Sequence, residues 1–263
     1  MTFLQILILG VVQGITEFLP VSSSGHLVVI QALFQSLEGQ TLPDVVAVNV
    51  LLHAGTLAAI VLFYRKRIVR LLFEDRRVVA LLAVGTLPAV AVGLTLKRMF
   101  PEFLASPLLA GFMFLLTGAL LIFSSRREGD DEEQHEYQNL SYLQAFGIGL
   151  FQAAAILPGL SRSGWTIAGG MLLGLRREAA TTFSFLLAIP VIGGATLLEL
   201  RDWSLAGEAI SLPLLGFGAA VAFAVGLVAL WLLVRIVERG RLAWFACWLF
   251  PLGIGVLVWQ LAT

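Results

Sequence analysis

Six long apolar runs divide this sequence, and they constrain its fold more than any other feature. Each has 17 to 23 residues, and together they cover 45–63, 78–96, 107–123, 181–199, 212–234 and 243–262. A helix of such length crosses a hydrocarbon core of about 30 Å. Only 13 % of the residues are charged, about half the share found in soluble domains. We therefore expect an all-α polytopic membrane protein with a single membrane domain over residues 1–263.

Two further apolar segments, 2–34 and 141–175, are interrupted near their middle by Ser, Gly and Pro together with an ionisable residue. Backbone that leaves the helix at membrane depth is tolerated where it is buried in protein or lines a cavity. Broken helices of this kind build the binding sites of many transporters. We expect each segment to be a re-entrant helix pair that enters and leaves the membrane on the same side.

An internal repeat relates these two segments. At an offset of 139 residues, the 27 pairs from Thr2/Ser141 to Val28/Ile167 align without a gap, and seven pairs are identical: Leu4/Leu143, Gln5/Gln144, Gly10/Gly149, Gln13/Gln152, Ser22/Ser161, Ser24/Ser163 and Gly25/Gly164. Repeat 1 then covers about 1–123, an acidic loop about 124–140 and repeat 2 about 141–263. Each half has one re-entrant pair and three transmembrane helices, and three crossings place the second half in the opposite orientation. This predicts an inverted-topology repeat.

The basic residues predict how the chain is oriented. With six crossings, one side receives only Lys97, Arg98 and Arg201, while thirteen basic residues lie on the other: Arg65, Lys66, Arg67, Arg70, Arg76, Arg77, Arg126, Arg127, Arg176, Arg177, Arg235, Arg239 and Arg241. The richer side is expected to be cytoplasmic, with both termini outside. The acidic stretch 128–136 is then a solvated cytoplasmic loop, in which we expect no role for His135. Because 17 basic and 17 acidic residues cancel, no nucleic-acid partner is expected.

The first polar segment, Gln13–His26, carries a carboxylate and an imidazole. Gln13 and Glu17 are four residues apart and share one helix face. Pro20 is expected to end that helix, and the serines that follow can cap the next one. In the second polar segment, Gln152–Thr166, a guanidinium (Arg162) takes the place of Ser23. The repeat predicts that the two polar segments meet near the membrane centre.

This combination of groups suits a phosphate ester. Arg162 can hold phosphate oxygens bidentately, and the N–H groups of a Ser-capped helix start favour an anion. Glu17 can share Mg²⁺ with substrate phosphates. His26 can be a general base, a general acid or the nucleophile, and Ser23 is the rival nucleophile. Burial of charge inside a membrane favours function, although Glu17 and Arg162 could form a purely structural ion pair.

Other polar residues carry a weaker signal. Ser22 and Ser24 either contact substrate or only cap and pack a helix. His53, in the run 45–63, either takes part in the site or bonds a neighbouring helix.

The motifs GVVQGITEFLPVSSSGHL and LPGLSRSGWTIAGGMLLG resemble the two signature motifs of the undecaprenyl-diphosphate phosphatase family, also called the bacitracin-resistance protein family. The resemblance extends over essentially the whole chain. The family's motif residues carry over to Glu17, Ser23 and His26 in the first segment and to Ser161, Arg162, Ser163 and Thr166 in the second. We expect catalytic roles for Glu17, Ser23, His26 and Arg162, and substrate binding by Gln13, Ser22, Ser24, Ser161, Ser163 and Thr166. Gln13 leaves Glu17 as the carboxylate of the first motif, and hence as the metal ligand.

The resemblance implies hydrolysis of undecaprenyl diphosphate to undecaprenyl phosphate and inorganic phosphate, assisted by Mg²⁺ or Ca²⁺. It further implies a bacterial plasma (inner) membrane protein, surrounded by membrane lipids, whose site opens to the outer face and recycles a lipid carrier for the cell wall, with bacitracin resistance as a consequence. A homo-oligomer is compatible with this class. The rival class is a lipid-phosphate flippase or secondary transporter, because inverted repeats with broken helices also build carriers around a midplane anion site.

Overall fold

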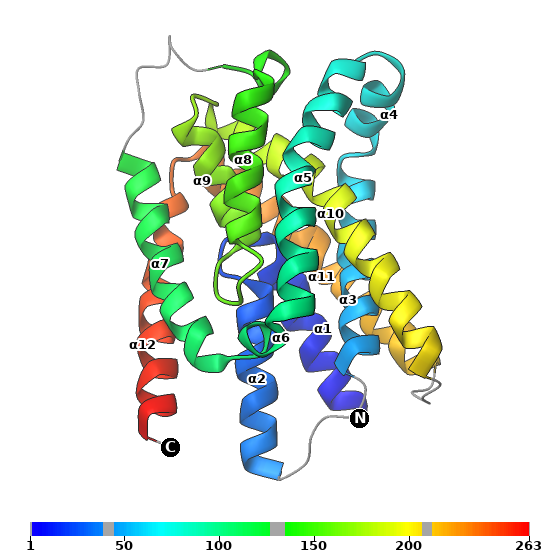
Figure 1. Cartoon of the computed structure of the whole chain (residues 1–263), viewed down its shortest axis with the longest axis vertical. Helices are drawn as coiled ribbons and strands as arrows, with labels where there is room; N and C mark the ends of the chain where they lie inside the picture. Colours follow the sequence, from blue (N-terminus) through cyan, green and yellow to red (C-terminus); the bar gives the residue numbers. More distant parts are fainter. Residues whose placement is uncertain (1, 39–44, 127–134, 207–211, 263) are drawn as a thin grey trace.

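The chain folds into a bundle of α-helices in a computed structural model that describes residues 2–38, 45–126, 135–206 and 212–262 (Figure 1). Within these ranges there is no β-strand, which confirms the predicted all-α class. The elements are α1 (Phe3–Phe18), α2 (Ser23–Glu38), α3 (Val45–Phe63), α4 (Arg65–Phe73), α5 (Arg76–Met99), α6 (Pro101–Leu104), α7 (Pro107–Arg126), η2 (Tyr137–Asn139), α8 (Tyr142–Ala154), α9 (Arg162–Leu172), α10 (Arg177–Ala206), α11 (Leu212–Glu238), η3 (Leu242–Phe245) and α12 (Ala246–Ala262).

Five described helical segments are long and apolar enough to cross a membrane: Arg76–Met99, Pro107–Arg126, Arg177–Leu198, Leu212–Glu238 and Leu242–Ala262. They correspond to five of the six predicted runs. The sixth run, 45–63, also forms a helix, α3, although only its part Val50–Phe63 counts as a shorter apolar helix. The protein is therefore a multi-pass membrane protein.

Each interrupted segment is a pair of helices joined by a turn, and the two pairs begin alike. Thr2 caps α1 through a capping box with Gln5, and Ser141 caps α8 through the same box with Gln144. Both boxes satisfy N–H groups that a helix start leaves unpaired. The first helix ends at Phe18, before Pro20, because proline lacks the N–H that a continuing helix would need.

The two helix pairs enter the bundle from opposite ends (Figure 1). The pair α1–α2 rises from the end that holds both termini, and α8–α9 descends from the other end, so their turns meet in the middle. Each pair packs against the other half of the chain, with α1 against α11 and α8 against α5. This arrangement supports the predicted inverted repeat, whose topology relative to a bilayer stays a prediction.

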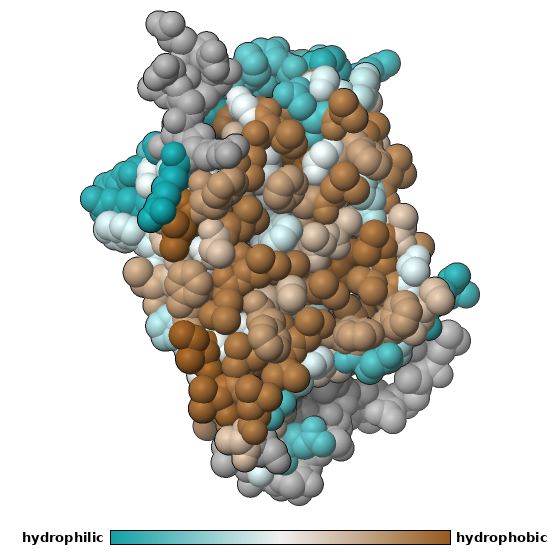
Figure 2. All heavy atoms as spheres, turned by 60° about the vertical axis from the view of Figure 1, so that its left-hand side comes forward, coloured by the Kyte–Doolittle hydropathy of each residue, from teal (hydrophilic) through white to brown (hydrophobic). Residues whose placement is uncertain are grey.

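On the face shown in Figure 2, apolar side chains form a broad band below a hydrophilic upper end, with further hydrophilic side chains near the lower end. The basic helix α4 lies at the end opposite both termini (Figure 1), as the predicted orientation requires. Of the predicted acidic loop, residues 127–134 lie outside the described residues. Glu136 forms an ion pair with Arg176, and the backbone of His135 pairs with Gly174 and Arg176.

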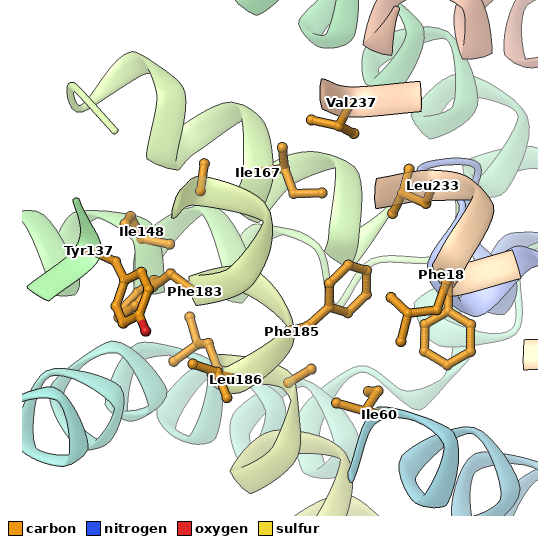
Figure 3. Close-up of a cluster of buried hydrophobic side chains, with 14 of the residues drawn as sticks. Phe18, Ile60, Tyr137, Ile148, Ile167, Phe183, Phe185, Leu186, Leu233 and Val237 are labelled. Carbon is orange, nitrogen blue, oxygen red and sulfur yellow. The ribbon is translucent and has the colours of Figure 1, made fainter. Parts of the chain in front are cut away.

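A buried core fixes the helices that carry the polar turns (Figure 3). Phe18 at the end of α1 contacts Phe185 of α10, with ring centroids 5.8 Å apart. Ile60 of α3 and Leu233 of α11 belong to the same cluster, and all four side chains are fully buried. Four helices are thereby tied together directly beside Glu17. The position of this residue is set by core packing as well as by its own hydrogen bonds.

Candidate active site

Glu17 lies at the centre of the polar cluster, in the last turn of α1, and is 7 % exposed. Its Oε1 accepts a hydrogen bond from Nη2 of Arg162 at 2.7 Å. Its Oε2 accepts one from Oγ of Ser23 at 2.6 Å and one from Nε2 of Gln13 at 3.2 Å. The predicted meeting of the two polar segments is thus present as a carboxylate held by donors from both helix pairs.

Arg162 is the first residue of α9, and only part of its donor capacity is used. Its Nη1 is buried and has no hydrogen-bond partner among the described residues. The guanidinium lies over the ring of Phe185, 5.8 Å from its centroid. Thr166 holds the start of α9 by donating to the carbonyl of Arg162 at 2.7 Å. A fork with one arm on Glu17 and one arm unpaired is suited to receive an anion.

The starts of α2 and α9 are built alike, because a serine caps each helix and the two turns lie close together. Oγ of Ser22 accepts from the N–H of Gly25 at 3.2 Å, and Oγ of Ser161 accepts from that of Gly164 at 3.1 Å. Oγ of Ser22 also accepts from the N–H of Gly159 in the opposite turn, at 3.1 Å. Two helix N-termini therefore meet at one place, where their partial positive charges favour an anion.

A cavity of about 250 Å³ lies at this meeting point, between the two turns and α3 and α10. Its lining consists of Thr16, Glu17, Ser22, Ser23, Ser24, His53, Gln152, Ala155, Ile156, Leu160, Ser161, Arg162, Val191, Ile192, Ala195 and Thr196. Of the predicted site residues, Glu17, Ser22, Ser23, Ser24, Ser161 and Arg162 thus face one space. Carboxylate, hydroxyls and guanidinium in one cavity provide the groups that phosphoryl transfer needs.

Three of the predicted substrate-binding residues do not line this cavity and support those that do. Gln13 bonds Glu17, as its spacing predicted. Ser163 donates to the carbonyl of Leu19 in the opposite turn at 3.4 Å. Thr166 bonds Ser184 of α10 in addition to the Arg162 carbonyl. Their direct contact with substrate stays a prediction.

His26 does not line the cavity either, and both its ring nitrogens are engaged. Its Nδ1 lies 2.7 Å from the carbonyl oxygen of Ser22, and its Nε2 accepts from the indole N–H of Trp248 at 3.0 Å. Because a carbonyl only accepts and an indole N–H only donates, the proton must be on Nδ1. The ring stacks on Trp248 and meets Phe114 edge-on. Neither nitrogen has a lone pair left for a substrate.

Known proteins match the chain over nearly its full length. The family model described as bacitracin resistance protein BacA matches residues 6–255. The chain belongs to this family. Relatives named undecaprenyl-diphosphatase include one from Rhodopirellula baltica, 50 % identical over 98 % of both chains, and one from Carboxydothermus hydrogenoformans, 37 % identical over 100 % of this chain and 99 % of the relative. A protein named undecaprenyl-diphosphatase 4 from Bacillus cereus is 38 % identical over 99 % of this chain and 98 % of the relative.

The structure of this BacA family member also places polar residues at the cavity that our sequence analysis did not select. Gln152 is 1 % exposed, and neither its amide oxygen nor its nitrogen has a partner among the described residues. Its one signal in the sequence is its alignment with Gln13. His53, whose role was left open, lies with Nε2 3.7 Å from Oε2 of Glu17. The hydroxyl of Thr196 is also buried and has no hydrogen-bond partner in the described part of the chain.

The donor set of this BacA site fits a divalent cation that is shared with substrate. A carboxylate has about four lone-pair sites, and Glu17 uses three of them for hydrogen bonds. Among the described residues, no three His, Cys, Asp or Glu side chains cluster to form a metal cage. A cation here would be held by Glu17 and phosphate oxygens, in the way Mg²⁺ is usually bound.

Proposed function

We propose that this protein is an integral membrane phosphatase that hydrolyses undecaprenyl diphosphate to undecaprenyl phosphate and inorganic phosphate. The observation that carries the proposal is the distance of 2.6 Å between Oγ of Ser23 and the buried carboxylate of Glu17, beside Arg162. This is the geometry of a nucleophile and its base. The BacA relatives named undecaprenyl-diphosphatase support the choice of substrate.

Ser23 is the nucleophile in this proposal and Glu17 its general base. Oγ of Ser23 forms a bond to the terminal phosphorus while its proton passes to Glu17. The bond from that phosphorus to the bridging oxygen breaks, and undecaprenyl phosphate leaves. Glu17 passes its proton to the departing undecaprenyl phosphate. It then takes a proton from water, which attacks the phosphoserine, and returns that proton to Oγ of Ser23 as inorganic phosphate leaves.

The charge on the transferred phosphoryl group is stabilised from the second helix pair. Arg162 binds terminal phosphate oxygens through its unpaired Nη1, and the first N–H groups of α2 and α9 point toward the same anion. A Mg²⁺ or Ca²⁺ ion held by Glu17 and the phosphates would supply further neutralisation of charge. Gln152 and His53 are further candidates for contact with phosphate oxygens.

His26 acts in this proposal as a positioning residue. Ser22 has φ 71°, a left-handed conformation that is strained for a residue other than glycine. The imidazole holds the Ser22 carbonyl, and Ser22 directly precedes the nucleophile. The exposed indole of Trp248 fixes the imidazole in turn. Both contacts stabilise the backbone from which Ser23 projects.

The direction of the site is part of the same proposal. With both termini outside, the turn of α1–α2 is reached from the outer side of a bacterial plasma membrane. The prenyl tail stays in the membrane while the diphosphate enters the cavity. No homo-oligomer is required, because both repeats of one chain supply the site.

Phosphate release from undecaprenyl diphosphate by the purified protein tests the proposal. We expect Mg²⁺- or Ca²⁺-dependent release that is lost in Ser23→Ala and Glu17→Gln, each by at least about 10³-fold because nucleophile and base act as a unit. Gly255→Ala, where a Cβ meets nothing within 4 Å and the residue does not line the cavity, should retain the activity. Full activity of Ser23→Ala would contradict the proposed mechanism.

The same samples separate the phosphatase from a flippase. In proteoliposomes, a flippase would move labelled undecaprenyl phosphate across the bilayer without releasing phosphate. Transport without hydrolysis that is unaffected by Ser23→Ala would contradict the phosphatase and indicate a flippase.

A further inference from the structure

A second, larger cavity of about 550 Å³ lies between α5 and α10, beside the catalytic cavity. Its walls are almost entirely apolar, with Val90 and Leu94 on α5, Val191, Gly194 and Leu198 on α10, and Ile156 from the turn after α8. We call this cavity the α5–α10 groove. Val90, Leu94 and Leu198 are 46 %, 39 % and 46 % exposed, so the groove is open on the apolar outside of the bundle.

The groove adjoins the catalytic cavity. Ile156, Val191 and Ala195 line both spaces. The composition changes sharply across this shared wall, from carboxylate, guanidinium and hydroxyls on one side to aliphatic side chains on the other. Lys97, the charged residue of the groove lining, lies near the end of α5 where the chain turns toward α6.

We propose that the α5–α10 groove binds the prenyl units closest to the diphosphate of the substrate. This inference rests on the proposed function. A prenyl diphosphate joins a branched hydrocarbon directly to a dianionic group, and the two adjoining spaces have the same polarity in the same order. A diphosphate on Arg162 and Ser23 leads its chain past Ile156 and Val191 into the groove. Burial there is favourable because it removes apolar surface from water and polar groups.

The binding energy of the prenyl chain in the groove contributes to catalysis. Contacts with a part of the substrate that does not react can hold the diphosphate in its reactive position. The groove would therefore distinguish long prenyl diphosphates from short ones through kcat/KM.

Gly194 offers a way to fill the groove without disturbing the fold. A Cβ added at Gly194 meets no atom within 4 Å, so a larger side chain would extend into the groove. Gly255 on α12 is a matched control, because a Cβ there also meets nothing within 4 Å and the residue does not line either cavity. Both changes replace a helix glycine by a better helix former.

The test compares Gly194→Leu and Gly255→Leu on two soluble probes. Farnesyl diphosphate carries several prenyl units, and isopentenyl diphosphate carries one. We expect Gly194→Leu to lower kcat/KM for farnesyl diphosphate by about 10-fold or more, the factor expected from losing contact with about two buried methylene groups. The value for isopentenyl diphosphate should change much less, and Gly255→Leu should match the wild type on both.

Equal kcat/KM of Gly194→Leu and wild type for farnesyl diphosphate would overturn the inference and would assign the groove to ordinary membrane lipid. A wild type that releases no phosphate from either probe or from undecaprenyl diphosphate would instead overturn the proposed function. Should Gly194→Leu fail to fold, a photoreactive prenyl diphosphate on the wild type decides. Labelling of α5 and α10 supports the groove, and labelling confined to α7, α11 or α12 contradicts it.

Discussion

Glu17 and Arg162 form an ion pair where charge is costly. Both side chains are largely shielded, at 6 % and 14 % exposure. A buried pair of this kind often stabilises a fold no better than apolar residues would, and ionisable groups inside membranes usually have a function. The Nη1 of Arg162, which has no partner within the described ranges, points to the same conclusion, since a purely structural pair would not leave a buried donor without a partner.

Replacing Arg162 by Lys tests the fork at this position. Lysine keeps the charge but is a single point donor, so it cannot hold Glu17 and a phosphate oxygen in the same geometry. We expect kcat/KM for phosphate release to fall by about 10²-fold or more. Arg98→Lys serves as the control, because Arg98 is exposed and does not line the catalytic cavity. Near wild-type hydrolysis by purified Arg162→Lys protein would show that charge alone suffices.

Contacts between residues close in the sequence could be predicted from their spacing, whereas contacts between residues far apart in the sequence could not. The Gln13–Glu17 bond follows from their separation by one helical turn. His26 stands three residues after Ser23 in the sequence, yet its ring turns to Trp248, 222 residues away. The sequence around His26 does not predict Trp248 as its partner, because the contact depends on how α12 packs. The proximity of His53 to Glu17 likewise depends on the packing of α3.

At the level of elements, the site exists because two turns approach each other very closely. A Cβ added at Gly25 would lie 2.7 Å from the N atom of Gly159 and 2.7 Å from a ring carbon of Phe114. Gly159 itself has φ +94° and faces the carbonyl of Ala110, a conformation that favours glycine. Glycine at both positions thereby lets the starts of α2 and α9 approach each other closely.

Gly25→Ala should force the two turns apart. Overpacking of this kind costs about 1–3 kcal/mol, and it would also increase the distance between Ser23 and Arg162. We expect a lower unfolding midpoint in detergent together with a loss of phosphate release. Gly216→Ala, where a Cβ meets nothing within 4 Å, should change neither. Unaltered activity of Gly25→Ala would mean that close contact of the turns is not required.

Helix types and approximate bounds could be predicted, since the lengths of the apolar runs and the position of Pro20 are local properties. The repeat even indicated that the polar turns meet. It could not indicate that each pair packs on a helix of the other half, with α1 on α11 and α8 on α5. The α5–α10 groove lies between a helix of the first half and a helix of the second half. Its aliphatic residues look in the sequence like any lipid-facing helix surface.

For the whole molecule, the uneven distribution of basic residues predicts which end faces the cytoplasm. Cysteine substitution in a Cys247→Ala background tests this. We expect Ala262→Cys to react with a membrane-impermeant thiol reagent on intact cells. Lys66→Cys, in the basic helix α4, should react only after the membrane is permeabilised. The reverse pattern would place the catalytic cavity toward the cytoplasm.

The central claim is that Ser23, activated by Glu17, takes up the phosphoryl group. Its most direct test is rapid acid quenching of the purified protein within one turnover of undecaprenyl diphosphate labelled in its terminal phosphate. The digested protein is then mapped by mass spectrometry. We predict an acid-stable, base-labile label on Ser23 that is missing in Ser23→Ala. An acid-labile label on His26, or a full burst of phosphate without any label on Ser23, would contradict the claim.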